Sequence, residues 1–391
     1  MQRAVKVCQL TNVHSPLDQR IYYKEAFSLA AAGYEVCVAG PGPGDMEGVR
    51  GGVRVVTVPR GRGVSGRLVN ALALFRKAAS MRADIYHFHD PELLPLGLLL
   101  RLTGSKVIYD CHEHFPQTVY VRRWVPGMLR RTFSVALDRI ERLFARHLSG
   151  VLGVVEEQGS RFGHRPFAAV RNFPRLEWFE ANGHPDGSGQ QEECELLHLG
   201  SLSPDRGSDF LVDVMQELGK THPGVRLRAV GRFHTSQDEA NFRRRLETCG
   251  LKDRILCSQE LVPYDRLGQM IRRHRIGLIP GQISVKNLAP FVPTKLFEYL
   301  ACGIPVVASD LPSIRAFYEE GDWGAIADPS DPAAHAREIS RLLEDPAAAA
   351  IKGKRGRVLV EERYNWGLES RKLIAFYDRI RNDGIDFGKE E

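Results

Sequence analysis

The sequence has no hydrophobic run long enough to cross a membrane. The longest apolar stretch, residues 93–102, is interrupted by Pro95 and Arg101 and falls well short of the roughly 20 residues that a spanning helix needs. The amino terminus also lacks the basic start, apolar stretch and cleavage site of a secretory signal. We therefore expect a cytoplasmic protein in which residues 93–102 form a buried helix.

Paired cysteines are also missing. The seven cysteines are scattered along the chain, and no two have the C-x-x-C spacing of a metal site. This pattern argues against a disulfide framework and a structural zinc site, and it fits reduced thiols. No long stretch is poor in apolar residues, so we expect the chain to fold throughout.

The length and composition of the chain are those of a two-domain globular protein. A single core rarely grows beyond roughly 250–300 residues, and the chain has 391. Apolar residues make up 43% of it and charged residues 26%, as in folded proteins. The formal net charge of +6 favours an anionic partner without identifying it.

Strand-like and helix-like segments alternate in both halves, which predicts an α/β protein with two Rossmann-like, doubly wound parallel-sheet domains facing each other across a cleft. We expect domains at residues 1–174 and 194–370, a linker at 175–193, and a C-terminal helix at 371–391 that packs back on the first domain. The expected strands are residues 5–10, 34–39, 53–58, 85–88, 106–110, 151–155, 195–199, 225–230, 255–258, 276–279 and 305–309. The expected helices include residues 22–32, 207–217, 237–248, 264–274, 294–301 and 333–343.

Polar residues gather after the strands, which is where open parallel sheets bind ligands. In the first half, the residues that follow expected strands include His14, His89, Asp90 and His112. In the second half, Gly200 and Ser201 end a strand, and Arg206 leads into a helix whose free N–H groups attract an anion. The alternative for Arg206 is a plain strand-to-helix turn with a solvated side chain.

The segment with the strongest functional signal is residues 287–309, NLAPFVPTKLFEYLACGIPVVAS. Pro293 fixes φ just before a helix, Thr294 can cap that helix, and Lys295 lies in its first turn. A cation there opposes the helix dipole unless a bound anion gathers it together with the helix N–H groups. Glu298 can accept both hydroxyls of a ribose, or it can simply pair with Lys295. Phosphate and ribose together indicate a nucleotide.

The stretch PTKLFEYLACGIPVVAS resembles the donor-binding helix and following strand of the family-4 retaining glycosyltransferases, which have the GT-B fold. Further stretches resemble the same family in the same order: TNVHSPLDQRIYYKEAFSLAAAGYEVCVA at 11–39, HFHDPELLPLG at 87–97, VIYDCHEHFP at 107–116, RNFP at 171–174 and LGSLSPDRG at 199–207. The resemblance covers nearly the whole chain.

The resemblance implies roles for single positions. Arg206 stands where the family usually has a lysine that binds the donor diphosphate, and Glu298 matches the glutamate that holds the ribose. Thr294 and Lys295 fall in the loop around the distal phosphate and sugar. His112 matches a histidine that faces the donor sugar.

Two positions depart from the family pattern. A second glutamate of the family is replaced by Pro290, and the basic residue that follows the glycine matched by Gly200 is replaced by Ser201. Contacts to the donor sugar are therefore expected from Lys286, Asn287, Lys295 or backbone N–H groups.

The resemblance also implies transfer with retention, in which the leaving phosphate accepts the acceptor's proton. Arg206, Lys295 and helix N–H groups neutralise the departing diphosphate, and the chain has no Asp-x-Asp, so we expect neither a metal nor another cofactor. The expected acceptor-side residues are His14, Asp18, Arg20, His89 and Asp90. Each has a structural alternative, since one of His87 and His89 is expected to face packed protein and Asp18 can form an ion pair with Arg20.

Residues 121–148 carry seven arginines against Asp138 and Glu141, with apolar residues between them. Such an amphipathic helix can lie on an anionic membrane, which suits a lipid-linked acceptor, or it can be an interdomain or core helix with solvated arginines. No nucleic-acid-binding motif accompanies the charge, so no nucleic acid is expected as a partner.

The sequence as a whole predicts a hexosyltransferase-type enzyme of polysaccharide biosynthesis. Its expected donor is a nucleotide diphosphate sugar, with UDP favoured and GDP second, and its expected acceptor is a saccharide, a lipid-linked molecule or a small molecule. Two alternatives stay open: a sugar-nucleotide epimerase or hydrolase of the same fold, and a non-catalytic protein that binds nucleotide sugars.

Overall fold

The computed structural model describes residues 3–44, 46–61, 63–112, 116, 126–163, 165–179, 195–288 and 293–382. The chain divides into two compact units. Unit 1 consists of Met1–Asn172 and Leu368–Glu391, and unit 2 of Phe173–Gly367. Within the described ranges, no helix combines the length and the apolar character needed to span a bilayer. The six described cysteines are free, and Cys194 lies outside the described residues.

Unit 1 is built on an eight-stranded sheet with the order β3-β4-β2-β1-β5-β6-β7-β8. Its strands are β1 (Lys6–Leu10), β2 (Glu35–Gly42), β3 (Glu47–Arg50), β4 (Val53–Pro59), β5 (Ile85–Phe88), β6 (Lys106–Cys111), β7 (Gly150–Gly153) and β8 (Phe167–Ala169). Neighbouring strands pair in parallel, except that the edge strand β3 runs antiparallel to β4. The sequence predicted the six central strands to within a few residues.

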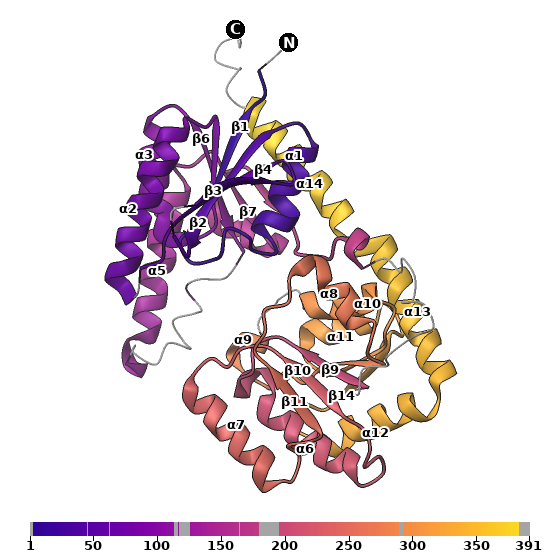
Figure 1. The fold of residues 1–391 in the computed structure, drawn as a ribbon. Coiled ribbons are helices and arrows are strands. Elements are labelled where there is room, and N and C mark those ends of the chain that lie inside the picture. The colour runs from indigo at the N-terminus through magenta and orange to yellow at the C-terminus, as the bar shows by residue number, and fades with distance from the viewer. Residues whose placement is uncertain are drawn as a thin grey trace. The chain divides into compact units, whose positions relative to one another are not determined.

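Helices cover both faces of this sheet. One face carries α2 (Gly63–Met81), α3 (Leu94–Leu102) and α5 (Arg130–Ala145), and the other carries η1 (Ile21–Ala26), α1 (Phe27–Ala31) and α14 (Trp366–Asn382) (Figure 1). Short 3-10 turns are η2 (Pro91–Leu93), η4 (Gly127–Leu129) and η5 (Glu156–Phe162). Alternate strand residues such as Leu10 and Phe88 form the core beneath the first face. The expected buried helix at 93–102 is buried on one side only, because Leu99 and Leu102 are exposed.

Unit 2 has a six-stranded parallel sheet with the order β11-β10-β9-β12-β13-β14. Its strands are β9 (Leu196–Leu199), β10 (Leu227–Val230), β11 (Ile255–Ser258), β12 (Ile276–Ile279), β13 (Val306–Ser309) and β14 (Gly324–Ala327). Its helices and turns are η6 (Leu176–Trp178), η7 (Pro204–Arg206), α6 (Ser208–Gly219), α7 (Ser236–Thr248), α8 (Tyr264–Ile271), α9 (Val285–Leu288), α10 (Thr294–Ala301), α11 (Pro312–Tyr318), α12 (Pro332–Glu344) and α13 (Pro346–Arg363).

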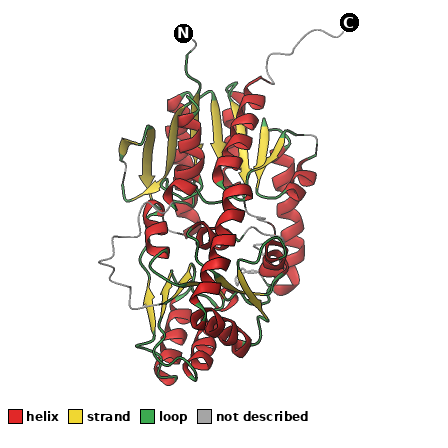
Figure 2. Cartoon of the chain, turned by 90° about the vertical axis from the view of Figure 1, so that its right-hand side faces the viewer, coloured by secondary structure: helices red, strands yellow, loops and turns green. Residues whose placement is uncertain are grey.

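In each unit the strands lie between layers of helices (Figure 2). In unit 2, Leu196 and Ile276 point to the face where Leu211 of α6 and Ile339 of α12 complete a buried core. The opposite face receives α10, since the Tyr299 ring packs against Gly277 of β12. The prediction of two doubly wound, mainly parallel α/β units is therefore confirmed.

Candidate functional site

In unit 2, the loop after β9 brings its backbone close to other groups through two glycines. Gly200 has a φ of +115°, and a Cβ atom there would overlap the Lys295 ammonium group. Gly207 has a φ of +83°, and a Cβ atom there would overlap the carbonyl oxygen of Pro280. Both the left-handed conformation and the close approach require glycine. Lys295 Nζ therefore lies directly against the backbone at the carboxyl end of β9.

A second cation lies at the same strand end. Arg206 is the last residue of the η7 turn and is half-buried, and no carboxylate among the described residues pairs with it. Burial, the charge of Lys295 and the charge of Arg206 together lower the pKa of His198, on β9, to about 3. His198 is thus neutral, and both cations act on the same point of the sheet.

The helix α10 presents its first N–H groups at this place. Thr294 was expected to cap the helix, but it is the first helical residue, because Pro293 occupies the cap position. The cap residue makes no side-chain hydrogen bond to the first turn of the helix. The helix dipole adds partial positive charge at this end. Lys295, Arg206 and the α10 N-terminus are therefore three positive groups around the Gly200 loop.

Tyr299 fixes α10 in this position. Its hydroxyl accepts a hydrogen bond from Leu199 N at 2.9 Å and donates one to Leu197 O at 3.1 Å. The helix is thereby fastened to β9, with Lys295 near Gly200 and the carboxylate of Glu298 buried one turn along. The sequence analysis assigned no role to Tyr299, although a hydroxyl-bearing aromatic in a buried helix signals a hydrogen bond.

Asn287 holds the turn that carries Arg206. Its Nδ2 donates to Asp205 O and to Gln282 O, each at 2.8 Å, so both amide hydrogens are used within the protein. Asn287 is therefore a positioning residue for η7. Ser201 is half-buried next to Gly200. Pro290 and the Lys286 side chain lie outside the described residues.

In unit 1, the expected acceptor-side residues converge at the carboxyl ends of β1, β5 and β6. The ring centroids of His14 and His112 are 5.5 Å apart, and those of His89 and His112 are 6.1 Å apart. The carboxylate of Asp90 lies 3.8 Å from His14 Nε2, and that of Asp18 lies 3.9 Å from His14 Nδ1. Three strand ends thus bring these side chains into one cluster, which extends inward to Arg20.

The segment before α1 is a π-helix rather than the expected α-helix at 22–32. Glu25 N donates to Arg20 O at 3.0 Å, which is the i to i+5 spacing, and all six residues of η1 are buried. Both Arg20 and Glu25 are turned into the interior of unit 1. Single π-helical turns occur frequently at functional sites.

Arg20 forms the centre of a buried ionic cluster. It donates to both oxygens of Asp110, from Nε at 2.7 Å and from Nη2 at 3.1 Å, and its Nε lies 2.9 Å from Glu25 Oε1. The ion pair between Asp18 and Arg20 was therefore a wrong alternative, since Asp18 accepts from the backbone N of Arg20 instead. Bidentate pairing of this kind fixes geometry as well as charge.

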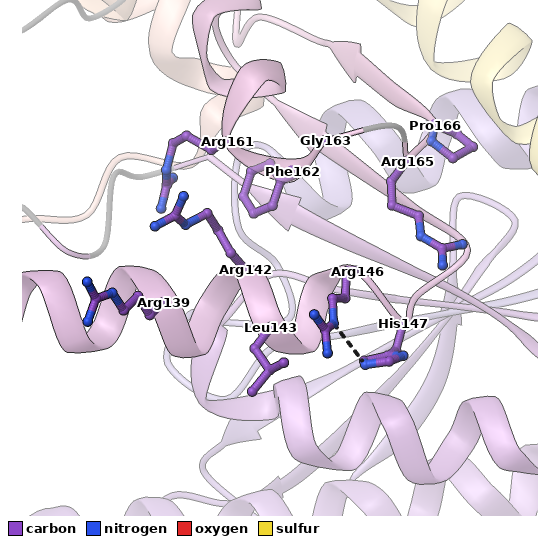
Figure 3. A pocket seen from close by; sticks show the side chains of 10 residues that line it. All are labelled: Arg139, Arg142, Leu143, Arg146, His147, Arg161, Phe162, Gly163, Arg165 and Pro166. Atoms are coloured by element: carbon purple, nitrogen blue, oxygen red, sulfur yellow. Dashed lines mark hydrogen bonds between the residues drawn. The ribbon is translucent and has the colours of Figure 1, made fainter.

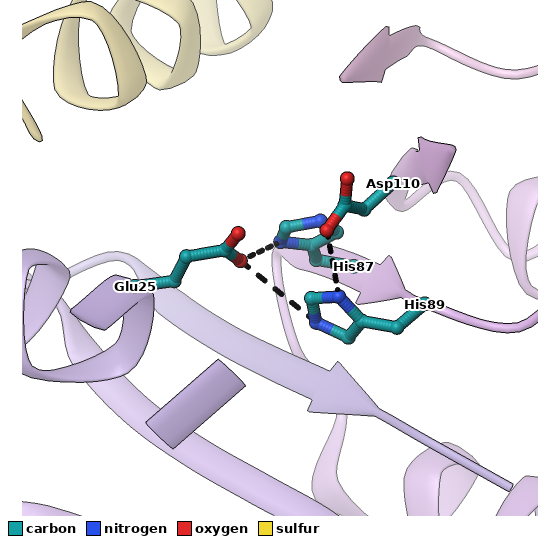
Figure 4. Close-up of side chains that lie close together, drawn as sticks. All are labelled: Glu25, His87, His89 and Asp110. Carbon is teal, nitrogen blue, oxygen red and sulfur yellow. Dashed lines mark hydrogen bonds and ion pairs between the residues drawn. The ribbon is translucent and has the colours of Figure 1, made fainter. Parts of the chain in front are cut away.

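His87, in β5, and His89, just after β5, both face this cluster (Figure 4). The side chains of His87 and His89 are fully buried, and their ring centroids are 4.4 Å apart. The sequence analysis expected one of them to face packed protein, and the structure buries both, because residues i and i+2 of a strand lie on the same face. His87 Nδ1 also lies 2.8 Å from the hydroxyl of Tyr377, on α14.

Burial sets the protonation of the cluster. It raises the pKa of Glu25 to about 8, so this carboxyl is protonated at neutral pH. It also lowers the pKa of both His87 and His89, which are neutral. Burial alone would raise the pKa of Asp110, but the charges of Arg20 and His112 hold it well below its usual range. Within this cluster, Arg20 and Asp110 are thus charged, whereas Glu25, His87 and His89 are neutral.

Glu25, His87, His89 and Asp110 offer donor atoms that all lie within 4.8 Å of one another, a set of the type that binds metal ions. The Arg20 guanidinium, however, contacts the carboxylate of Asp110 and the carboxyl group of Glu25, and it supplies the positive charge that a divalent ion would bring. We therefore interpret the set as an ion-pair network. Its outermost contact is from Asp110 Oδ2 to His112 Nδ1, at 3.4 Å.

Only part of this cluster remains accessible. The side chains of His112, His14 and Asp18 are 17%, 34% and 30% exposed, whereas Arg20, His89 and Asp90 are buried beneath them. The accessible three are able to touch a ligand, and the buried three support them. Glu25 and Asp110 had no assigned role in the sequence analysis. The signal for Asp110 was its place two residues before His112 at the end of a strand.

Two protein-family models match the chain, one in each unit. The model described as "Glycosyl transferase 4-like domain" matches residues 24–172, and the one described as "Glycosyl transferases group 1" matches residues 193–345. Among relatives, a D-inositol 3-phosphate glycosyltransferase of Acidothermus cellulolyticus is 28% identical over 190 residues, which cover 47% of this chain and 40% of the relative. The chain thus spans less than half the length of that protein.

A phosphatidyl-myo-inositol mannosyltransferase of Mycolicibacterium smegmatis is 26% identical over 377 residues, covering 91% of this chain and 88% of the relative. Two solved structures share the fold. Sucrose-phosphate synthase of Thermosynechococcus elongatus has a TM-score of 0.74 at 20% identity, covering 97% of this chain and 100% of that one. Anabaena HepE in complex with UDP-glucose has a TM-score of 0.71 at 16% identity, covering 96% and 99%. The resemblance found in the sequence is confirmed, and the chain belongs to the family-4 glycosyltransferases of GT-B fold.

Proposed function

We propose that the protein transfers a sugar from a nucleotide diphosphate sugar to an acceptor, with retention of configuration and without a metal ion. The observation that carries this proposal is the group of Arg206, Lys295 and the uncapped start of α10 around Gly200, with the buried carboxylate of Glu298 one turn along the same helix. Three positive groups suit a diphosphate, and a carboxylate one turn along the same helix suits the ribose of a nucleoside.

Each donor-side residue has a separate task in this proposal. Lys295 and Arg206 bind the diphosphate, and Thr294 and Ser201 donate hydrogen bonds to the distal phosphate and the sugar. Glu298 accepts the ribose hydroxyls. Since both Asn287 amide hydrogens are bonded to backbone carbonyls, Asn287 acts by holding the Arg206 turn.

The reaction breaks the bond between the anomeric carbon and the phosphate oxygen, which leaves negative charge on the diphosphate. Fixed cations that are already in place stabilise this charge more strongly as it develops, and they are worth roughly 100- to 1,000-fold in rate. The leaving phosphate then accepts the proton of the acceptor hydroxyl, which enters from the same face. Two protein cations and a helix terminus do the work of a divalent ion, so we propose no metal and no other cofactor.

On the acceptor side we propose that His112 contacts the donor sugar, while His14 and Asp18 contact the acceptor. Arg20, His89 and Asp90 act from beneath as positioning residues, because their side chains are buried and bonded within unit 1. In this arrangement residues 1–174 with 371–391 form the acceptor-side domain, 194–370 form the donor domain, and 175–193 link them.

UDP is the donor base that we favour, with GDP second. HepE, which shares the fold, was solved with UDP-glucose, and the relatives are named for inositol phosphate and phosphatidylinositol acceptors. We propose a saccharide, a lipid-linked molecule or a small polyol as the acceptor, in a pathway of polysaccharide or glycan synthesis. The enzyme would act in the cytoplasm, in peripheral contact with an anionic membrane through the described part of residues 121–148.

The test has two stages. Thermal unfolding with UDP, GDP and ADP identifies the base, because a ligand at 100 times its Kd stabilises the fold by about 2.7 kcal/mol. Turnover of the matching nucleotide sugars is then followed with and without EDTA. We expect Arg206→Gln and Glu298→Gln to abolish the thermal shift, and the matched pair Arg244→Gln and Glu247→Gln, on exposed α7, to keep it. A full shift in the first pair contradicts the proposal, and release of free sugar without any acceptor favours a hydrolase.

A further inference from the structure

Unit 1 contains a basic pocket of about 950 Å³ that the proposed reaction does not use. It lies between the C-terminal half of α5 and the segment that leads from η5 into β8 (Figure 3). The basic side chains that line it are Arg139, Arg142, Arg146, His147, Arg161 and Arg165. Leu143 and Phe162 add apolar wall. None of the described residues that line the pocket is acidic.

The arginines are only partly neutralised by the protein. Arg161 pairs with Asp138 at 2.7 Å and with Glu141 at 2.8 Å, and Arg142 pairs with Asp138 at 2.7 Å. For Arg139, Arg146 and Arg165, the described part of the chain offers no carboxylate partner. Arg146 donates to His147 Nε2 at 3.1 Å, which leaves its charge without an anionic partner. Three such guanidinium groups around one hollow repel one another, and phosphate has a geometry that matches an arginine fork.

The far end of the pocket is separated from the proposed acceptor site by the length of the sheet. Arg146 and His147 come just before β7, and Arg165 comes just before β8. The acceptor-side residues instead follow their strands. Since the strands are parallel, residues before them and residues after them lie at opposite edges of the sheet. An anion held by Arg146 and Arg165 is therefore separate from the proposed acceptor site.

An exposed apolar stripe borders the pocket. Leu129, Phe133, Ile140 and Leu143 follow one another at intervals of four, seven and three residues, so they share one face of the η4–α5 helix. They are 45%, 44%, 49% and 46% exposed, and Met128, just before them, is 96% exposed. Leu143 belongs both to the stripe and to the pocket wall. An apolar face beside an arginine-rich one is the pattern of a helix that lies in a membrane interface.

We propose that this pocket binds the phosphate of an anionic phospholipid headgroup while the stripe inserts into the bilayer interface beside it. The pocket supplies the charge complementarity, and the stripe supplies the apolar area that free phosphate could not use. The inference deepens the peripheral membrane contact of the proposed function and rests on that contact, but it is independent of the donor chemistry.

The experiment is flotation of the full chain with vesicles of phosphatidylcholine alone or of phosphatidylcholine mixed with phosphatidylglycerol. We expect binding to the anionic vesicles only. The triple variant Arg139→Gln, Arg146→Gln and Arg165→Gln should bind roughly 100-fold more weakly, because each arginine near an anionic surface contributes roughly fivefold. The control triple Arg244→Gln, Arg266→Gln and Arg379→Gln makes the same change in net charge at exposed positions and should bind like the wild type.

The stripe is tested separately. Ile140→Asn with Leu143→Asn should weaken flotation while leaving every arginine in place, and exposed Ile351→Asn with Val358→Asn on α13 is the matched control. The proposal is overturned if the stripe pair and the control pair lose vesicle binding equally, or if the stripe pair loses none. Retained binding in the pocket triple overturns it too. So does release of the protein from vesicles by free glycerol 3-phosphate, which points to a soluble phosphate ligand, or by an RNA oligonucleotide, which points to nucleic acid.

The UDP thermal shift is measured on the same preparations. The pocket and stripe variants should keep the wild-type shift, because their substitutions lie in unit 1, whereas the Gly200 loop belongs to unit 2. Loss of flotation with a full UDP shift supports the membrane pocket. A wild type that floats but shows no shift with any nucleotide keeps the pocket and contradicts the donor proposal, so the two failures are distinguishable.

Discussion

The two units balance the charge of an arginine at their candidate sites in opposite ways. In unit 1, Arg20 has a bidentate partner in Asp110 and a second contact in Glu25, so its charge is satisfied inside the protein. In unit 2, no described carboxylate pairs with Arg206, and the start of α10 is uncapped. The cluster around Arg20 is therefore a structural scaffold, because its charged groups are bonded to one another. The group of cations around Gly200 is instead a site whose charge is balanced when an anion binds.

The strongest way to break this comparison is to remove a partner from the scaffold. Asp110→Asn leaves the buried Arg20 charge without its main partner, and we expect unfolding in urea to cost about 3–5 kcal/mol less than in the wild type. Asp84→Asn, at an exposed ion pair with Arg3, should change stability by no more than about 1 kcal/mol. Equal effects of the two substitutions would show that the cluster is not the scaffold described here.

The donor site should respond in activity rather than in stability. Lys295→Met removes a cation that contacts the Gly200 backbone, and we expect kcat/KM to fall by roughly 100- to 1,000-fold. The melting temperature should change little without nucleotide, because the cation opposes the helix dipole when no anion is bound. Lys354→Met, exposed on α13, is the matched control. A large loss of stability with unchanged kcat/KM contradicts the assignment.

Tyr299 should affect both stability and activity, because it is a structural residue that holds the donor site in place. Tyr299→Phe removes a hydroxyl that bonds both Leu199 N and Leu197 O, which leaves a buried N–H without its partner. We expect a loss of about 1–3 kcal/mol in unfolding free energy and a raised KM for the donor. Tyr318→Phe, a half-buried residue on α11, serves as the control. An unchanged KM would show that the hydrogen bonds of Tyr299 do not position the donor site.

The sequence predicted much of the fold and of the gathering of site residues. Parallel strands end at one edge of a sheet, so His14, His89 and His112 had to meet once their strands were located. The helix 294–301 was found at its observed bounds because Pro293 precedes it and Gly303 follows it. Edge strands β3 and β8 were missed because β3 is fully exposed and β8 has only three residues.

Contacts between distant positions could not be predicted. Arg20 and Asp110 are 90 residues apart, and His87 and Tyr377 are 290 apart, so no local pattern links them. The π-helix η1 was also out of reach. The same residues satisfy an α-helical pattern, and the two helices are told apart by backbone hydrogen bonds of i to i+5 spacing, such as that from Glu25 N to Arg20 O. Charge satisfaction is a property of the folded core, which explains why the scaffold was seen only in the structure.

A change of pH sharpens the comparison further. The pKa of Glu25 is raised by burial to about 8, above the 4.5 of an exposed glutamate, so the folded state holds this proton more tightly. Its stabilising contribution is complete below pH 4.5 and is lost as the pH rises through 8, by at most about 1.4 kcal/mol per pH unit. Glu25→Gln mimics the protonated form. The difference in unfolding free energy between wild type and variant, measured by urea titration from pH 5 to 9, should therefore move in favour of the variant as the pH rises. A difference that stays constant would mean that Glu25 is ionised throughout, and unit 1 would then carry an unbalanced buried charge of the kind that distinguishes unit 2.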